Sequence, residues 1–150
     1  MNEKTQIQHF IVSVRYENFK QLRDNGFKLI GFPEASVMAK HLNIGDRLVL
    51  YIGSRKSQLA AILQINSEMM EKYDMTWDDF FPTRYETKPL IVLPKNQYLD
   101  MREIKNGLSF INPEITKFGV YFMSGLKRIT DDDYNYLSKL FEEATREGKA

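Results

Sequence analysis

Residues 26–52 read GFKLIGFPEASVMAKHLNIGDRLVLYI. This stretch contains a Gly31-Phe32-Pro33 corner, one predicted helix, a Gly45-Asp46 turn and the apolar run 48–52. Pro33 suits the first turn of the helix because its missing N–H would have no partner there anyway. The turn residues stop the helix, and the unbroken apolar run indicates a strand covered on both faces. The corner opens onto this strand, so backbone N–H groups and an aromatic ring can face a ligand there.

Further strands and helical segments are predicted on both sides of this stretch. Alternation or short apolar runs predict four further strands, over residues 9–15, 59–65, 87–93 and 117–123. Helical spacing predicts three short helical segments, over residues 17–24, 68–73 and 101–105. The small pair Ala60-Ala61 indicates close packing in its strand.

The last helix has the strongest local signals in the chain. Thr130 can cap it, Asp133 stands where a capping box places its acidic residue, and the run Asp131–Asp133 complements the helix dipole. The apolar stripe of this helix consists of Tyr134, Leu137, Leu140, Phe141 and Ala144. No repeat or linker divides the chain, so residues 1–150 are predicted to form a single α+β domain on a curved, mostly mixed or antiparallel sheet.

Composition narrows the classes of protein that this chain can represent. Its 150 residues carry a net charge of +1, which argues against a strongly basic coat but allows a local basic groove. The absence of cysteine excludes disulfides, thiolate zinc sites and a cysteine nucleophile. No apolar stretch reaches membrane-spanning length and the first residues are too polar for a signal peptide. We therefore expect a cytoplasmic protein with no membrane partner.

The inventory of catalytic groups is poor. The two histidines, His9 and His41, lack metal-ligand spacing, and both are better explained as surface or structural residues. There is no G-x-S-x-G nucleophile motif and no phosphate-binding glycine loop. We expect no enzyme activity, no metal and no cofactor.

The segment from Trp77 to Tyr85 concentrates aromatic residues in an irregular stretch. These rings can close one end of the sheet as a plug, which is the simpler interpretation, or they can form walls for a flat ligand. Stacking on a base contributes about 1–3 kcal/mol, which is comparable with the few kcal/mol that base flipping costs. Arg84 would then contact a phosphate or the base edge.

Four segments of the chain form an ordered set of motifs: Phe10–Val14 with Arg15 and Glu17; Gly31-Phe32-Pro33 with Gly45-Asp46 and Tyr51; Phe81-Pro82-Thr83-Arg84-Tyr85; and Leu108–Ile111 with Lys117-Phe118-Gly119. From about residue 10 to residue 141, this order resembles the EVE domain family of the PUA-like superfamily, which also contains the YTH readers. Phe10 and Phe118 stand where the family has tryptophans, and Arg84-Tyr85 stands where it has an arginine pair.

The resemblance implies a PUA-like, barrel-like sheet decorated by helices. It also implies a pocket between the first strand, the Gly31-Phe32-Pro33 corner and the loop before Arg84. Our leading hypothesis is a non-enzymatic module that reads a modified base in DNA or RNA. The expected base-binding residues are Ser13, Gly31, Phe32, Pro33, Trp77, Phe81 and Phe118, and the expected phosphate contacts are Arg15, Arg84 and Lys117.

Two other functions are consistent with the residues: the same pocket can take a free small molecule or nucleotide, and a purely structural partner role is also open. An enzyme acting on nucleic acid is disfavoured by the missing catalytic groups. Salt separates the first alternative from the reader, because only a polyanion releases counterions when it binds.

Overall fold

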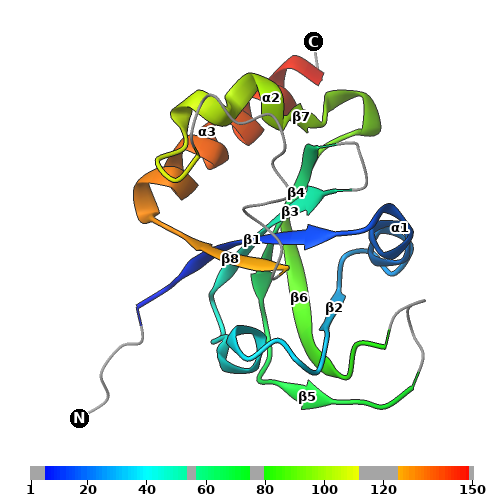
Figure 1. Cartoon of the computed structure of the whole chain (residues 1–150). Helices are drawn as coiled ribbons and strands as arrows, with labels where there is room; N and C mark the ends of the chain where they lie inside the picture. The colour runs from blue at the N-terminus through cyan, green and yellow to red at the C-terminus, as the bar shows by residue number, and fades with distance from the viewer. Residues whose placement is uncertain (1–5, 54–56, 75–79, 112–124, 149–150) are drawn as a thin grey trace.

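The structure is a computed structural model that describes residues 6–53, 57–74, 80–111 and 125–148 (Figure 1). Its centre is an eight-stranded sheet in which six strands follow the order β2-β6-β4-β3-β1-β8, while β5 pairs with β6 and β7 with β4. Only the β1–β3 pair is parallel among the strand pairs of the described residues. The strands are β1 (His9–Val14), β2 (Leu29–Phe32), β3 (Arg47–Ile52), β4 (Gln58–Ile65), β5 (Met70–Glu71), β6 (Thr83–Val92), β7 (Leu99–Asp100) and β8 (Leu126–Ile129).

In the described part of the chain, three α-helices lie on two sides of this sheet (Figure 1). Helix α1 (Tyr16–Asp24) follows β1, whereas α2 (Met101–Ile104) and the C-terminal α3 (Asp131–Gly148) lie together on the other side. Single 3₁₀ turns are formed by η1 (Met38–His41), η2 (Lys95–Gln97) and η3 (Lys105–Gly107). The architecture is the predicted α+β fold on a curved, mixed sheet. Among the described residues, none of the helices combines the length and the apolarity that crossing a bilayer requires.

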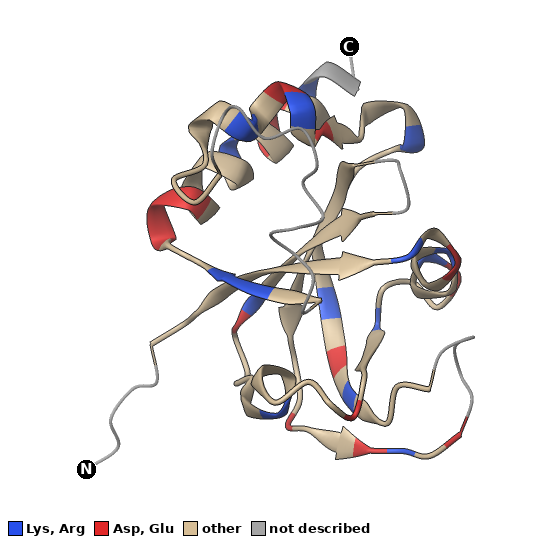
Figure 2. Cartoon of the chain, in the orientation of Figure 1, with Lys and Arg blue, Asp and Glu red and all other residues tan. Residues whose placement is uncertain are grey.

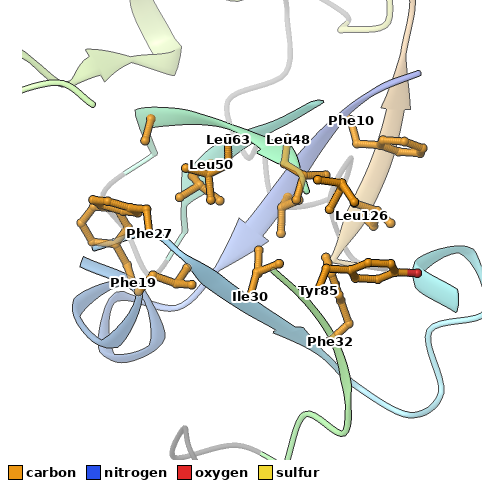
Figure 3. Packing of buried hydrophobic residues seen from close by; sticks show 14 of the residues in the cluster. Phe10, Phe19, Phe27, Ile30, Phe32, Leu48, Leu50, Leu63, Tyr85 and Leu126 are labelled. Carbon is orange, nitrogen blue, oxygen red and sulfur yellow. The ribbon is translucent and has the colours of Figure 1, made fainter. Parts of the chain in front are cut away.

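The two faces of β3 belong to two different hydrophobic cores. Leu48 and Leu50 pack in the core that also contains Phe19 of α1, shown in Figure 3. The alternate residue Val49 packs in the second core, together with Phe141 of α3. Successive side chains of a strand point to opposite faces, so the apolar run is buried on both sides, and this prediction from the sequence is confirmed.

A bulge explains the small pair Ala60-Ala61 in β4. Leu50 of β3 lies opposite Ala61 and Tyr51 lies opposite Leu59, so Ala60 is the extra residue of the bulge. Both alanines are fully buried, and both belong to the first core. An extra residue in one strand bends it and resets its alternation, which contributes to the curvature of the sheet.

The prediction of a helix after Pro33 is wrong. The structure instead forms a turn closed by a hydrogen bond from the Ser36 N–H to the Pro33 carbonyl, and then the 3₁₀ turn η1, in which the Lys40 N–H donates to the Val37 carbonyl. The reason is a tertiary contact, because the Tyr85 hydroxyl donates to the Ala39 carbonyl at 2.6 Å and accepts from the Leu42 N–H at 3.3 Å. These bonds satisfy backbone groups that a longer helix would pair internally.

The region before β6 also differs from the sequence-based prediction. The helical turn expected over residues 68–73 is instead the short strand β5, which pairs with Thr83 and Arg84 of β6. Strand β6 begins at Thr83, four residues before the predicted start at Thr87. The sequence did not predict β8, and the strand predicted over residues 117–123 lies outside the described residues.

The start of α3 confirms the predicted cap. The Thr130 hydroxyl accepts from the Asp133 N–H at 3.1 Å. The two carboxylate oxygens of Asp133 accept from the Ser109 N–H at 2.9 Å and from the Ser109 hydroxyl at 2.7 Å. The buried Asp133 thereby joins the helix start to the connection after η3, beyond the capping role expected from the sequence.

His9 is a structural residue at the start of β1. Its ring stacks on Tyr134 of α3 with centroids 4.0 Å apart, and its Nε2 lies 3.2 Å from Oδ1 of Asp131. Burial lowers the pKa of the His9 imidazole, Asp131 opposes that shift, and the Arg47 guanidinium adds to it. The net pKa lies below the ordinary value of about 6.5.

We expect the stability of the protein to fall as the pH drops below about 6.5, because the unfolded chain then binds a proton at His9 more readily than the folded chain does. Thermal unfolding midpoints measured between about pH 7.5 and pH 5 should therefore decrease less in His9→Gln than in the wild type. His41→Gln, at an exposed position, is the matched control. An equal decrease in all three proteins would show that His9 does not titrate with a lowered pKa.

Candidate nucleic-acid interface

A cavity of about 110 Å³ lies where the end of β1, the first turn of α1 and the end of β2 meet. The Ser13 N–H of β1 donates to the Gly125 carbonyl at 2.8 Å, which fixes the residue before β8 at the edge of this cavity. Gly125 has a φ of +82°, a conformation that favours glycine. The walls are formed by Val12, Ser13, Val14, Arg15, Asn18, Gly31, Phe32, Pro33, Ser36, Phe81 and Gly125.

Six residues that the sequence nominated for a base pocket lie together in these walls. They come from three segments that are distant in the sequence, and they are Ser13, Arg15, Gly31, Phe32, Pro33 and Phe81. Three other nominated residues, Trp77, Lys117 and Phe118, lie outside the described residues. The remaining nominated residue, Arg84, does not line the cavity.

The two aromatic walls differ in burial. Phe32 is 3% exposed and packs edge-on against Tyr85, with ring centroids 6.2 Å apart, so it serves the core as well as the cavity. Figure 3 shows these two rings side by side. Phe81 is half-buried and packs against the same core from outside. The cavity therefore offers one rigid and one more accessible aromatic wall.

Sequence reasoning missed Asn18. This residue is 3% exposed and lies on the buried face of α1 with Phe19 and Leu22. An amide carries donors and an acceptor, the combination that reads the edge of a base. The signal was present, because Asn18 stands four residues before Leu22 and therefore shares the inward face of the predicted helix.

Arg84 has a structural role in this fold. Its side chain is 4% exposed and its Nη1 lies 2.7 Å from Oδ1 of Asp74. Its Nη2 donates to the Asp74 carbonyl at 2.7 Å and its Nε donates to the Phe81 carbonyl at 3.0 Å. The guanidinium thus ties two loop positions to β6 and holds the residue that supplies the accessible aromatic wall. This geometry does not support the phosphate contact expected from the sequence.

Replacing Arg84 by lysine is expected to lower the free energy of unfolding by about 1–3 kcal/mol, because an ammonium cannot reproduce the planar fork that bonds two carbonyls and a carboxylate. The measurement is urea unfolding of Arg84→Lys beside Lys88→Arg, an exposed exchange in the same strand. A variant as stable as the wild type, with a reduced salt dependence of nucleic-acid binding, would restore Arg84 as a phosphate contact.

The parts of the chain that the structure describes contain no evident metal-binding site. No group of three or more histidine, aspartate or glutamate side chains among those residues is placed to hold a metal ion. The expectation that the protein needs no metal stays a prediction, to be checked by elemental analysis of the purified protein.

No protein-family model matches this chain, and no curated protein matches its sequence. Solved structures do match its fold. The YTH domain-containing protein mmi1, solved as a complex with RNA, aligns with a TM-score of 0.67 and 14% identity over 95% of this chain and 87% of that one. The YTH domain of the Zygosaccharomyces rouxii MRB1 protein, in complex with N6-methyladenosine RNA, aligns with a TM-score of 0.60 and 14% identity over 94% and 90%.

A third similar structure is a hypothetical protein from Leishmania major, with a TM-score of 0.64 and 13% identity over 93% of this chain and 98% of that one. At these identities the likeness establishes the fold. The chain therefore has an α+β fold similar to that of these YTH domains, as expected for its fold class.

Proposed function

We propose that this protein is a non-enzymatic nucleic-acid-binding domain that holds one modified base in the cavity between β1, α1 and β2. The observation that carries the proposal is that six residues nominated from the sequence line one small cavity, together with the buried amide of Asn18. Within this proposal the domain is a cytoplasmic member of the EVE family.

The walls of the cavity suit a flipped base. Phe32 and Phe81 supply aromatic surface on which a base can stack, at about 1–3 kcal/mol per base. Asn18 and Ser13 supply hydrogen-bonding groups for the base edge. Arg15 is exposed at the point where β1 passes into α1, and there its charge can meet the phosphate of the same nucleotide.

RNA is the first polymer to test, because two of the similar folds were solved with RNA bound. We expect single-stranded RNA that carries one modified base to bind more tightly than the unmodified strand or the matching DNA. Affinity should fall steeply between about 50 and 200 mM salt. A free nucleoside that binds as tightly as the RNA, with no salt dependence, would establish the small-molecule alternative instead.

A further inference from the structure

The cavity continues into an open groove along the edge of the described sheet. Pro33 and Ser36 line both the cavity and an adjoining hollow of about 470 Å³. Val37 and Met38 line that hollow and a third one of about 460 Å³, which ends at Arg128 of β8. We call this row of adjoining hollows from Pro33 to Arg128 the β8 groove.

The floor of the β8 groove is apolar and exposed. Val37 and Met38 are 69% and 46% exposed, although both are hydrophobic. They stand exposed because Tyr85 holds η1 at its other side, through Ala39 and Leu42. An apolar floor of this kind can contact the bases and sugars of a single strand, whose faces are apolar whatever the sequence.

Strand alternation places one cation at the end of the groove. In β8, Arg128 lies opposite Phe10 of β1 and lines the groove with it. The preceding residue, Lys127, faces the other way and places its Nζ 5.2 Å from the centre of the Phe110 ring. Figure 2 shows basic residues along β8, directly before the acidic start of α3.

The charge of this path is of one sign. The charged residues that line the cavity and its two adjoining hollows, among the described ones, are Arg15 and Arg128, with no aspartate or glutamate. Beyond Arg128 the next acidic residue of the chain is Asp131 at the start of α3, and it lines a further hollow together with Arg128. A polyanion can therefore follow the path from the cavity to Arg128 and meets repulsion beyond it.

From these observations we propose that the β8 groove holds the nucleotides on one side of the bound base, with Arg128 on a phosphate. This inference rests on the proposed function and adds the direction in which the RNA strand leaves the base pocket. From Gly125 at the cavity to Arg128, the strand rises roughly 10 Å at 3.3 Å per residue, so only the nucleotides next to the base are held. A charge-assisted bond to phosphate supplies the contact at Arg128.

The test uses three single-stranded RNAs of equal length and sequence composition that carry one N6-methyladenosine at the centre, at the 5′ end or at the 3′ end. Because the described residues form a groove on one side of the cavity, one end-placed RNA should bind about as well as the central one and the other should bind several-fold more weakly. Arg128→Gln should weaken the two tight RNAs several-fold, reduce their salt slope by about 1, and leave the weak RNA unchanged.

Lys127→Gln is the matched control, because it removes the neighbouring charge of the same strand from the opposite face. An equal effect of Arg128→Gln on all three RNAs, or no effect on any, would overturn the groove while leaving the base pocket in place. Binding of the free N6-methyladenosine nucleoside alone, without RNA binding, would also overturn the groove and would favour the small-molecule alternative. Binding of an extended peptide along β8, with no RNA binding, would overturn the proposed function as well.

Discussion

Replacing Tyr85 by alanine is expected to lower the free energy of unfolding by about 3–5 kcal/mol, the cost of removing a large buried aromatic side chain. Tyr85 is fully buried, contacts Phe32 edge-on and bonds the backbone of η1 through its hydroxyl. Tyr85→Phe keeps the ring but leaves the Ala39 carbonyl and the Leu42 N–H without this partner. We expect that variant to lose about 1–3 kcal/mol.

Urea unfolding followed by circular dichroism measures both losses. Tyr73→Phe is the control, because Tyr73 is 64% exposed and its hydroxyl bonds only to the neighbouring Glu71 among the described residues. We expect that control to unfold like the wild type. If Tyr85→Phe also unfolds like the wild type, the hydroxyl does not hold η1, and the exposed floor of the β8 groove loses its structural explanation.

Replacing Asn18 by leucine is expected to weaken binding of the modified RNA about tenfold to a hundredfold, which corresponds to roughly 1–3 kcal/mol for a lost set of base-edge hydrogen bonds. Leucine has a similar size and suits the buried face that Asn18 shares with Phe19 and Leu22. The free energy of unfolding should therefore be retained or raised while affinity falls. Fluorescence anisotropy titration beside urea unfolding separates the two quantities.

Lys20→Ala on the exposed side of α1 is the control for this experiment, and it should change affinity little. Asn18→Asp adds a finer comparison, because the carboxylate keeps the shape of the amide and removes its N–H donors. Unchanged affinity in Asn18→Leu would show that the amide does not face the base, and the cavity would then lose its means of reading a base edge.

The central strands were predictable because their signals are local. The apolar run in β3 and the Thr130 cap depend on residues within a few positions of each other, and the structure confirms both. The segment after Pro33 was not predictable in this way. Its conformation is fixed by Tyr85, which lies more than forty residues further along the chain, and no local pattern contains that contact.

In the candidate site, too, some features were predictable from the sequence and others depend on tertiary contacts. The resemblance of ordered motifs brought the β1 end, the Gly31-Phe32-Pro33 corner and Phe81 together before the structure did. The structural role of Arg84 was not predictable, because its partner Asp74 pairs with it only after β6 and the preceding loop have folded. Asn18 was overlooked because a helical prediction assigns its inward face to core packing, where a polar side chain is easily passed over.

A structure of the complex with single-stranded RNA that carries one N6-methyladenosine tests the central claim most directly. The account predicts that the modified base is flipped into the cavity between Phe32 and Phe81, with the Asn18 amide within hydrogen-bond distance of its edge. It also predicts that the neighbouring nucleotides on one side run toward Arg128. RNA bound elsewhere on the domain, with the cavity unoccupied by a base, would contradict the account.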